Sequence, residues 1–397
     1  MRSQVMLSQP PSPVDGAARP PAPRVERRVG PGRRASDRRA ADVRAAVRRA
    51  TDPVHRARAP LRISFAGGGT DTSPFREREG GVVLSTTINR YAYGTLRARG
   101  DGQVHIDSLD FGQTATFPVA GDVGLGDALD LPRAAVARLR THAEHFNADC
   151  GFDLFLHSSA PPGSGLGSSS AMMVTLVGAM QSFYRLPLSE YEVAELAHEI
   201  ERRDLGREGG MQDHYAAAFG GFNFIEFEAD RVIVNPLRIG ADILSELEYS
   251  LLLAFTGSTR SSDRIIADQS ARYEAGVKDA LAGLRAQKEL AVAMKDALLR
   301  ARLAEFGSLL GEAWQAKKRM SPRITTPEID EMYEQAIRAG ALGGKVTGAG
   351  GGGFMLFYCE YDRKHRVAAA LDRMGAPVSD IGFDQEGLRR WTTQVPR

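Results

Sequence analysis

The stretch Pro161–Ala171 combines three glycines at alternate positions with three consecutive serines, and the apolar run Met172–Met180 follows it directly. Glycine lets backbone N–H groups turn toward an anion because it has no Cβ in the way. The apolar run predicts a buried helix, the serines can cap its first turn, and its N-terminus carries about half a positive charge. The sequence therefore predicts an anion site without a lysine, formed by a tight turn that enters a buried helix.

Two better-known phosphate loops do not fit this stretch. A Walker A loop needs Gly-Lys-Ser/Thr after its glycines, and the nearest match, Gly344-Lys345-Val346, has the wrong spacing and no hydroxyl. A Rossmann fingerprint fails on its spacing and on the acidic residue that should follow a second strand. A glycine-rich loop that merely starts a helix is the structural alternative, but three glycines with three hydroxyls exceed what helix capping requires.

Charge divides the chain into a basic tail and a mildly acidic body. Residues 1–58 hold 14 Arg, no Lys and 5 Asp or Glu, a net charge of +9, so the total of +2 leaves −7 for residues 59–397. The tail is rich in Pro, Ala and Arg, and we expect a disordered extension or a misassigned start codon. Binding of an acidic partner by the tail is the alternative. An acidic body argues against a nucleic-acid-binding domain.

Composition places the body among globular chains, with 43% hydrophobic and 25% charged residues. No apolar run approaches the roughly 18 residues of a membrane span or forms the core of a signal peptide. The two cysteines, Cys150 and Cys359, match no metal or redox spacing and fit a reducing compartment. We therefore expect a cytoplasmic chain without membrane contact.

Ser169 and two acidic residues indicate a magnesium site. A hydroxyl at a helix N-terminus can coordinate the Mg²⁺ that bridges nucleotide phosphates, and Mg²⁺ also takes a carboxylate ligand. Glu201 and Asp213 are the candidates. Glu199 and Glu201 lie on different faces of one helix, so only one of them can point inward. A carboxylate on a helix usually faces solvent, but Asp213 follows a Gly-Gly turn and precedes the apolar Tyr215–Phe219.

Two further glycine segments complete the pattern. Arg62–Asp71 places an arginine, three glycines and a Thr-Asp pair at the end of a predicted strand. An aspartate beside glycines can accept two sugar hydroxyls, and an Asx turn is the alternative. The run Gly348–Gly353 matches G-x-G-x-x-G in letters, but a predicted strand, Phe354–Phe357, follows where a Rossmann site needs a helix. A close approach of the backbone to a bound ligand is the better interpretation.

The order of predicted elements favours an α+β fold over a doubly wound sheet, because strands and helices alternate irregularly. Predicted strands are 61–66, 82–85, 92–97, 104–107, 114–117, 152–157, 222–227, 232–235, 249–255, 354–358 and 378–381. Predicted helices are 131–146, 168–183, 189–203, 211–219, 276–300, 303–318, 327–338 and 363–374, and Ser189 with Glu192 predicts a capping box. A break near 236–242 divides the body into domains 59–238 and 239–397, after the tail 1–58.

The three glycine segments, in this order and at these separations, resemble the motifs of the superfamily of galactokinase, homoserine kinase, mevalonate kinase and phosphomevalonate kinase. The resemblance covers residues 59–385 and is most specific at Pro161–Ala171. Ser64–Asp71, Gly210–Asp213 and Gly348–Phe354 look most like the motifs of D-glycero-D-manno-heptose 7-phosphate kinases, with fucokinase-like enzymes as a rival. Galactokinases carry Gly-Glu-His where this chain has Gly67-Gly68-Gly69, which argues against galactose.

The resemblance implies a fold and a set of roles. The N-terminal domain would be like part of ribosomal protein S5, and the C-terminal domain would be ferredoxin-like. Asp213 and Arg62 would be catalytic, and Ser169 with Glu201 would hold Mg²⁺. The phosphates of ATP would be bound by Pro162, Gly163, Ser164, Gly165, Leu166, Gly167, Ser168, Ser169 and Ser170. The substrate would be bound by Gly68, Gly69, Thr70, Asp71, Gly348, Gly350, Gly351, Gly352 and Arg260.

We expect an ATP- and Mg²⁺-dependent transfer of the γ-phosphate to the anomeric hydroxyl of a sugar phosphate, D-glycero-D-manno-heptose 7-phosphate, for nucleotide-activated heptose synthesis. Such transfer depends on positioning and charge neutralisation, so a basic residue should meet the sugar's own phosphate. Arg260, Lys317 and Lys318 are the candidates.

Three alternatives remain at this stage. They are a kinase of another sugar such as L-fucose, an NAD-dependent oxidoreductase that uses the second glycine run, and an inactive nucleotide-binding regulator with a DNA-contacting tail. The expected partner is a small-molecule sugar or sugar phosphate, nucleic acid is not expected, and the sequence leaves a homodimer open.

Overall fold

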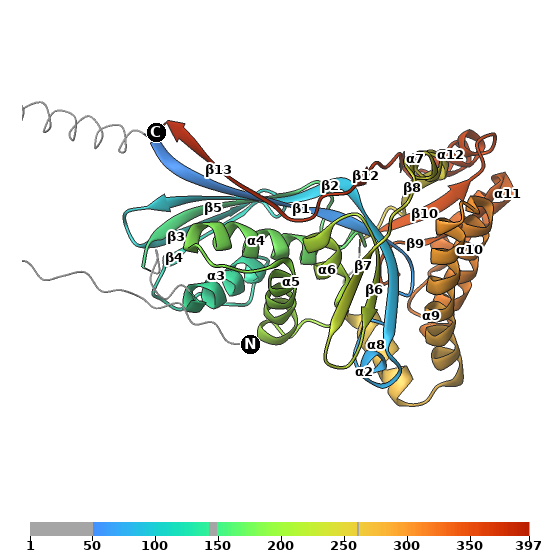
Figure 1. The fold of residues 1–397 in the computed structure, drawn as a ribbon, viewed down its shortest axis with the longest axis horizontal. Coiled ribbons are helices and arrows are strands. Elements are labelled where there is room, and N and C mark those ends of the chain that lie inside the picture. The colour runs from blue at the N-terminus through green and yellow to red at the C-terminus, as the bar shows by residue number, and fades with distance from the viewer. Residues whose placement is uncertain (1–50, 143–148, 260–261, 397) are drawn as a thin grey trace, which may run out of the picture. The chain divides into compact units, whose positions relative to one another are not determined.

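The computed structural model describes residues 51–142, 149–259 and 262–396, which form two sheets with helices packed against them (Figure 1). In this described part the larger sheet has nine strands in the order β13-β1-β2-β5-β3-β4, with β6 and β12 also paired to β2 and β7 paired to β6. The strands are β1 (Thr51–Ala66), β2 (Gly81–Arg99), β3 (Gln103–Ser108), β4 (Gln113–Pro118), β5 (Gly151–Ser158), β6 (Phe222–Phe227), β7 (Val232–Pro236), β12 (Phe383–Asp384) and β13 (Arg389–Pro396). β3 and β5 are parallel, while β2 is antiparallel to β1, β5 and β6.

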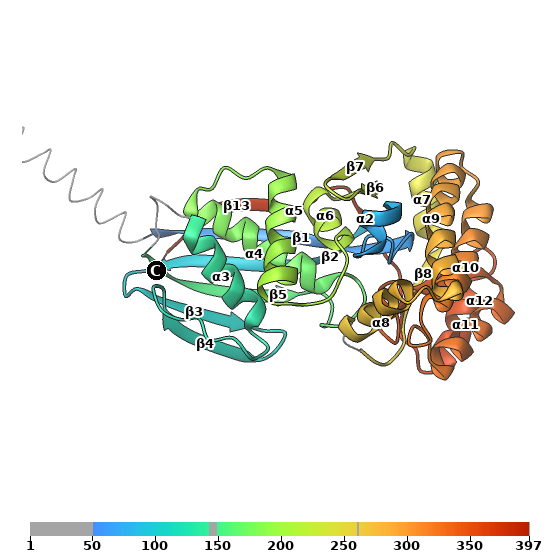
Figure 2. The same ribbon diagram turned by 90° about the horizontal axis from the view of Figure 1, so that it is seen from below.

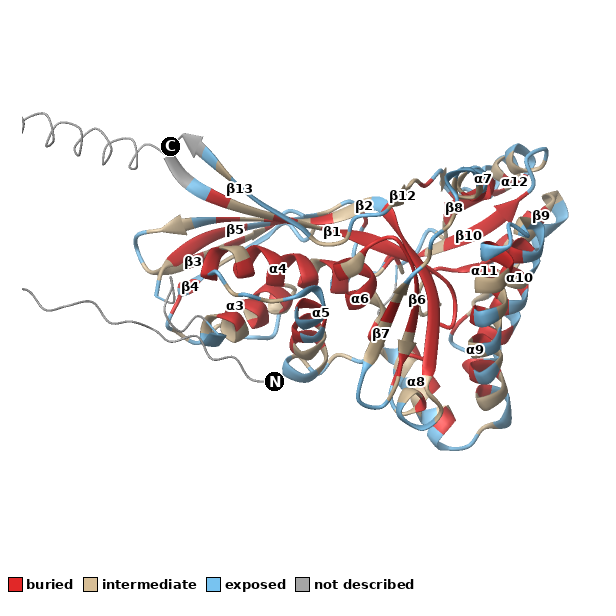
Figure 3. Ribbon diagram, viewed as in Figure 1, coloured by how far each residue is buried: buried red, intermediate tan, exposed pale blue. Residues whose placement is uncertain are grey.

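Four helices lie on one face of the larger sheet (Figures 1 and 2). They are α3 (Asp130–His142), α4 (Ser168–Tyr184), α5 (Glu190–Glu199) and α6 (Gln212–Phe219). The predicted apolar run forms the middle of α4, which is buried on nearly all sides (Figure 3). α5 begins with the predicted capping box of Ser189 and Glu192 and continues into a π-helical turn, η1 (Ile200–Asp204).

The smaller sheet is antiparallel, in the order β11-β8-β10-β9. Its strands are β8 (Leu251–Phe255), β9 (Ala341–Val346), β10 (Phe354–Cys359) and β11 (Val378–Ser379). The remaining helices of the described part are α2 (Phe75–Glu79), α7 (Ala241–Ser250), α8 (Asp263–Glu274), α9 (Lys278–Leu299), α10 (Leu303–Met320), α11 (Pro327–Ala339) and α12 (Lys364–Arg373). α9 and α10 pack along each other, and because α10 contacts β9 while α9 contacts β2, this pair joins the two sheets.

Two strands are longer than the sequence predicts. β1 begins at Thr51, so residues 51–58, which we expected in the tail, belong to the sheet. β2 runs unbroken from Gly81 to Arg99, where two short strands were predicted. Thr86 and Thr87 interrupt its apolar pattern, but both are buried and paired with β1. Backbone pairing on both sides therefore overrides the local polarity.

Six elements were not predicted: α2, α7, α8, β9, β12 and β13. α7 includes Tyr249, which we expected in a strand, although Ile243, Leu244 and Leu247 have helical spacing. α8 buries only two apolar side chains, Ile265 and Tyr273, so its apolar face is narrow. The predicted domain 239–397 would place the end of the chain with the smaller sheet. In the structure, β12 and β13 belong to the larger sheet instead.

The α+β prediction is confirmed, with mixed helices and mostly antiparallel pairing in both sheets. Residues 1–50 of the tail and residues 143–146 of a predicted helix lie outside the described residues. Across the residues that are described, no helix combines the length and the apolar character needed to cross a membrane.

Candidate active site

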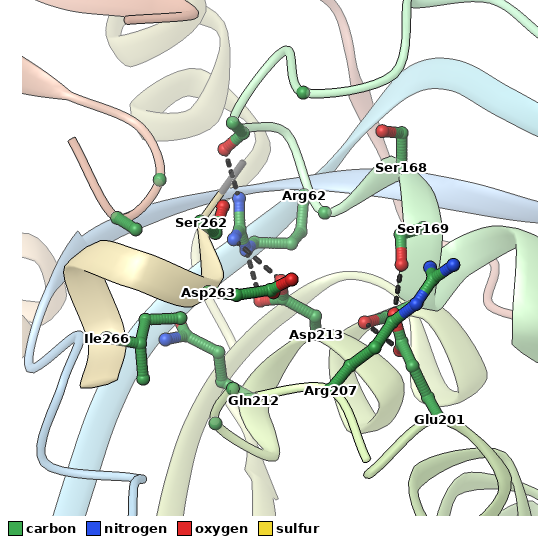
Figure 4. A pocket seen from close by; sticks show the side chains of 18 of the residues that line it. Arg62, Ser168, Ser169, Glu201, Arg207, Gln212, Asp213, Ser262, Asp263 and Ile266 are labelled. Atoms are coloured by element: carbon green, nitrogen blue, oxygen red, sulfur yellow. Dashed lines mark hydrogen bonds and ion pairs between the residues drawn. The ribbon is translucent and has the colours of Figure 1, made fainter. Parts of the chain in front are cut away.

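A cavity of about 480 Å³ opens where the three glycine segments meet. Its wall includes the turn before α4, the loop after β1 and the loop between β9 and β10. Further parts of the wall come from η1, α6, α8 and α10, so helices beside both sheets contribute. Figure 4 shows the region in which Arg62 faces Asp213 and Ser169 faces Glu201.

The turn before α4 owes its shape to glycine. Gly163, Gly165 and Gly167 have φ angles of 75°, 77° and 74°, a region that disfavours any side chain. Gly167 is the N-cap of α4, and no side chain caps the helix. The prediction that the serines cap α4 is therefore wrong. The first N–H groups of a helix have no partner within it, so this end of α4 can bind an anion.

Beneath the start of α4 lies a buried polar cluster centred on Glu201. Its carboxylate accepts hydrogen bonds from the hydroxyls of Ser169 and Ser170, the latter at 2.8 Å, and lies 2.7 Å from His214 Nε2. Burial would raise the pKa of Glu201, but the charge of Arg202 and the hydrogen bonds from His214 and Ser169 outweigh it and hold the pKa below its usual range. The cluster thus keeps a carboxylate charge next to Ser169, in the first turn of α4.

Arg62 connects the three glycine segments. Its Nε and Nη2 donate to the two carboxylate oxygens of Asp213 at 2.7 and 2.9 Å. Its Nη1 donates to the carbonyl oxygens of Gly165 at 2.7 Å and Thr347 at 3.3 Å. Arg62 is only 5% exposed, and a bidentate pair of this kind fixes the orientation of both groups. The Asp213 carboxylate is therefore held in place beside the glycine turn.

The turn before α6 fixes Asp71. The Asp71 carboxylate accepts hydrogen bonds from the backbone N–H of Gly69 and from the backbone and side-chain N–H groups of Gln212, at 3.0–3.1 Å. A Cβ on Gly210 would lie 1.9 Å from Asp71 Oδ2, so only glycine permits this approach. Burial raises the pKa of Asp71, although the hydrogen bond from the Gln212 backbone opposes the shift. Asp71 borders the cavity with both oxygens already engaged.

Comparison with known proteins gives the family. Residues 130–221 match the GHMP kinases N terminal domain, and residues 294–378 match the GHMP kinases C terminal domain. Over 337 residues the chain is 40% identical to the D-glycero-alpha-D-manno-heptose 7-phosphate kinase of Campylobacter jejuni, a match that covers 85% of this chain and 98% of that protein. The chain belongs to the GHMP kinases. The resemblance drawn from the three glycine segments is thereby confirmed.

Two further similar proteins are sugar kinases by name. The crystal structure of a D-glycero-D-manno-heptose 1-phosphate kinase from Bacteriodes thetaiotaomicron matches with a TM-score of 0.70 at 36% identity, over 85% of this chain and 98% of that one. The L-fucokinase/L-fucose-1-P guanylyltransferase of Bacteroides fragilis is 29% identical, over 77% of this chain and 34% of that protein.

Most residues expected from the GHMP kinase motifs line the cavity. Those on its wall are Arg62, Gly68, Gly69, Asp71, Pro162, Gly163, Gly165, Gly167, Ser168, Ser169, Ser170, Glu201, Asp213 and Gly348. The expected residues that the structure describes away from the wall are Thr70, Ser164, Leu166, Gly350, Gly351 and Gly352. Arg260 lies outside the described residues.

The residues away from the wall have structural contacts instead. The Thr70 hydroxyl donates to the carbonyl oxygens of Gly67 and Val82 at 2.8 and 2.9 Å, which closes the loop after β1. Leu166 is buried in the core, and its carbonyl oxygen accepts from the Arg62 backbone N–H at 3.0 Å. These residues support the cavity from behind.

The second glycine run supports the first turn. A Cβ on Gly348 would lie 2.7 Å from Gly165 Cα, and one on Gly353 would lie 2.4 Å from the carbonyl oxygen of Ser164. Phe354 N donates to that same oxygen at 3.0 Å. The run thus closely approaches the other glycine turn, and the predicted approach to a ligand stays a prediction for Gly348, which lines the cavity. Because β10 follows the run directly, the NAD-dependent alternative is excluded.

Sequence reasoning missed part of the cavity wall. Ile266 and Gln269 come from α8, which was not predicted, and Lys345 has no local signal. Of the two lysines on α10, Lys317 lines the cavity, whereas Lys318 pairs with an aspartate of α11 at 3.2 Å. Helical spacing could have separated them, because the buried residues Ala313, Trp314, Lys317 and Met320 share one face.

The residues around Ser169 fit a Mg²⁺ ion bound to nucleotide phosphates. Ser169 and Glu201 offer hydroxyl and carboxylate oxygens, the kind of ligand that Mg²⁺ prefers. Glu199 instead pairs with Arg138 at 2.8 Å nearer the surface. Among the described residues, no group of three or more His, Cys, Asp and Glu side chains could hold a metal ion. A sparse protein ligand set suits an ion that also takes phosphate oxygens and water.

Proposed function

We propose that this chain is an ATP-dependent kinase that transfers the γ-phosphate of ATP to the anomeric hydroxyl of D-glycero-D-manno-heptose 7-phosphate. The observation that carries the proposal is the meeting, in one cavity, of the α4 N-terminus with the Arg62–Asp213 pair. The first suits the phosphates of ATP, and the second suits a hydroxyl that must lose its proton. The likeness to the heptose 7-phosphate kinase of Campylobacter jejuni supports the choice of substrate.

ATP would bind along the turn before α4. Its phosphates would accept hydrogen bonds from backbone N–H groups of the turn and of the first helical residues. Apolar side chains on the cavity wall would contact the adenine, which is flat and has little charge. These side chains belong to Phe111, Ala128, Leu131, Pro162 and Met172.

In the proposed reaction the acceptor hydroxyl donates a hydrogen bond to Asp213. A bond forms between the sugar oxygen and the γ-phosphorus, the bond from that phosphorus to the bridging oxygen of ADP breaks, and the hydroxyl proton passes to the Asp213 carboxylate. Arg62 holds this carboxylate and is itself held by the carbonyl oxygens of Gly165 and Thr347. Phosphoryl transfer depends mainly on such positioning.

Mg²⁺ would be held by Ser169 and Glu201, and when bound it supplies positive charge that neutralises the phosphates. Ser170 donates to Glu201 Oε2, and His214 lies beside the same oxygen. These contacts leave Oε1 on the side of Ser169. The chain thereby presents one hydroxyl and one carboxylate oxygen together at the start of α4.

An ADP-release assay with the purified full-length protein and a panel of sugars and sugar phosphates tests this function. We expect turnover with D-glycero-D-manno-heptose 7-phosphate and, by phosphorus NMR, a product phosphorylated at the anomeric carbon. Turnover of L-fucose without turnover of the heptose would show that the chain is an L-fucose kinase instead. The likeness to the Bacteroides fragilis protein supports this alternative. Binding of ATP without ADP release from any acceptor would support an inactive nucleotide-binding regulator.

A cytoplasmic location and a homodimer remain predictions from the sequence. Cell fractionation checks the first, and light scattering on the purified protein measures the second.

A further inference from the structure

Four buried polar atoms of cavity-wall residues have no hydrogen-bond partner among the described residues. One, Arg202 Nε, lies beside Glu201, and the other three are Ser64 Oγ, Gln212 Oε1 and Gln269 Nε2. Ser64 is 3% exposed and Gln269 is 4% exposed. Buried donors and acceptors are nearly always paired in native proteins, so a cluster of unpaired ones indicates a place where a ligand or ordered water completes the hydrogen bonds.

These last three atoms gather around the glycines of the loop after β1. A Cβ on Gly68 would lie 3.5 Å from Ser64 Oγ, 3.5 Å from Gln212 Nε2 and 3.8 Å from Lys317 Nζ. A Cβ on the next residue, Gly69, would lie 2.4 Å from Met320 Cε and 3.3 Å from Gln269 Oε1. The four side chains come from β1, α6, α8 and α10 and line the cavity, and Gly68 leaves room between Ser64, Gln212 and Lys317.

Lys317 adds an unpaired ammonium group to this cluster. It is 4% exposed, and the described residues act on it only through burial and through the charges of Asp71, Arg62 and Asp213, without a hydrogen bond. The other two buried cations nearby are already engaged, since Arg62 pairs with Asp213 and Lys345 donates to a backbone carbonyl oxygen at 2.6 Å. Lys317 is therefore the free cation of this part of the wall.

The surrounding charges favour a neutral ligand over a phosphate. The carboxylates of Asp71 and Asp213 and the guanidinium of Arg62 all act on the Lys317 ammonium. The charge of Arg62 is already paired with Asp213, so a phosphate at this position would meet one free ammonium and two carboxylates, and the like charges would repel. A hydroxyl group both donates and accepts, so hydroxyls can pair with the amide oxygen of Gln212, the amide N–H of Gln269 and the ammonium of Lys317 at once.

We propose that Ser64, Gln212, Gln269 and Lys317 form the subsite that recognises the hydroxyl groups of the acceptor, with Gln269 and Lys317 as specificity-determining residues. This inference rests on the proposed sugar kinase function. It assigns the phosphate group of a sugar phosphate to another part of the cavity. The residues that select the acceptor would then lie on α8 and α10, outside the glycine motifs.

Two variants, Lys317→Met and Gln269→Leu, test the proposal, with Lys318→Met as the matched control because that ammonium lies outside the cavity. We expect each test variant to raise the KM for heptose 7-phosphate by on the order of tenfold to a hundredfold, with the KM for ATP changed less than twofold. Lys317→Arg should restore part of the loss. Equal changes in both KM values, or none, would overturn the proposal.

Deoxy and dephosphorylated acceptors separate the ligand groups. With the wild type, a deoxy sugar that lacks the recognised hydroxyl should raise the acceptor KM as much as the variants raise it for the full sugar. With a variant, the deoxy sugar should cause no further increase in KM, because the same hydrogen bond is already lost. If the effect of Lys317→Met disappears with the unphosphorylated heptose, Lys317 recognises the phosphate and the proposal is wrong. Melting temperatures check folding, and Gln269→Leu decides the matter if Lys317→Met does not fold.

Wild-type measurements distinguish this inference from the proposed function. If the wild type releases no ADP with any acceptor, the function fails, and calorimetric titration of the same sugars into wild type and Lys317→Met then tests the subsite directly. Weaker binding of the sugar to the variant would sustain the subsite without the reaction. Equal binding, or no binding to the wild type, would overturn the subsite.

Discussion

Replacing Asp213 with Asn tests the centre of the proposed site with the smallest change of shape. The two donors of Arg62 that now reach Asp213 at 2.7 and 2.9 Å would meet one oxygen and one NH₂ group. One hydrogen bond survives, and the other becomes a contact between two donors. The variant also lacks the carboxylate that would take the proton of the acceptor hydroxyl.

The magnitude follows from burial. The Arg62 side chain is 6% exposed and the Asp213 side chain 19%, and removing one partner of a buried ion pair typically costs about 3–5 kcal/mol. Arg62 keeps its bonds to the carbonyl oxygens of Gly165 and Thr347, so we expect a smaller loss of stability, about 1–3 kcal/mol. Loss of the proton acceptor should lower kcat by about 10²- to 10⁴-fold.

Asp153→Asn is the matched control. Asp153 is 5% exposed and pairs with Arg97 and Arg99 at 2.9 and 2.6 Å on the larger sheet, away from the cavity wall. Urea unfolding gives the stability of both variants, ADP release gives kcat, and calorimetry gives the affinity for ATP. Near-wild-type turnover in Asp213→Asn, or an equal loss of turnover in Asp153→Asn, would refute the proposed role of Asp213.

Three further predictions address the turn, the metal and a buried lysine. Ser169→Ala should require more Mg²⁺ for half-maximal rate at saturating ATP, and an unchanged Mg²⁺ titration would argue against Ser169 as a ligand. Gly167→Ala should cost about 1–2 kcal/mol through its left-handed backbone and abolish most activity, because its Cβ would lie 3.3 Å from a carboxylate oxygen of the buried ion pair. Gly276→Ala, with a φ of 68° and no atom within 4 Å of its Cβ, should cost similar stability and leave activity intact. Burial lowers the pKa of Lys317 from 10.5 to about 8, so between these values the unfolded chain binds a proton that the folded chain does not. The folded protein should therefore gain stability relative to Lys317→Met as the pH rises from 8 to 10.5, and parallel unfolding curves across this window would contradict the shift.

Local features of the site could be predicted from the sequence because their causes are local. Alternating glycines before an apolar run predict the turn and the start of α4, and Ser189 with Glu192 predicts the start of α5. Helical spacing puts Glu199 and Glu201 on different faces, so the sequence predicts that only one of them points inward. In each case the residues that determine the structure lie within a few positions of one another.

Other features depend on contacts between distant segments. The serines after Gly167 look like helix caps. In the structure, the hydroxyls of Ser169 and Ser170 donate hydrogen bonds to Glu201, which lies more than 30 positions later in the chain. β13 was not predicted, and its pairing partner is β1, at the other end of the described chain. A window of neighbouring residues does not contain the information that selects these structures.

The position of the proposed acceptor subsite depends on contacts between segments that are far apart in the sequence. Gln287 of α9 accepts a hydrogen bond from the backbone N–H of Gly67 at 3.1 Å and donates to the Ala313 carbonyl of α10 at 2.5 Å. The loop after β1 is thus tied to the same helix pair that carries Lys317. Substitutions on α9 or α10 can therefore shift the acceptor subsite against the glycine turn while every motif residue stays unchanged. Glycine motifs accordingly identify a kinase of this family more readily than they identify its sugar, because the residues proposed to read the sugar lie on helices outside the motifs.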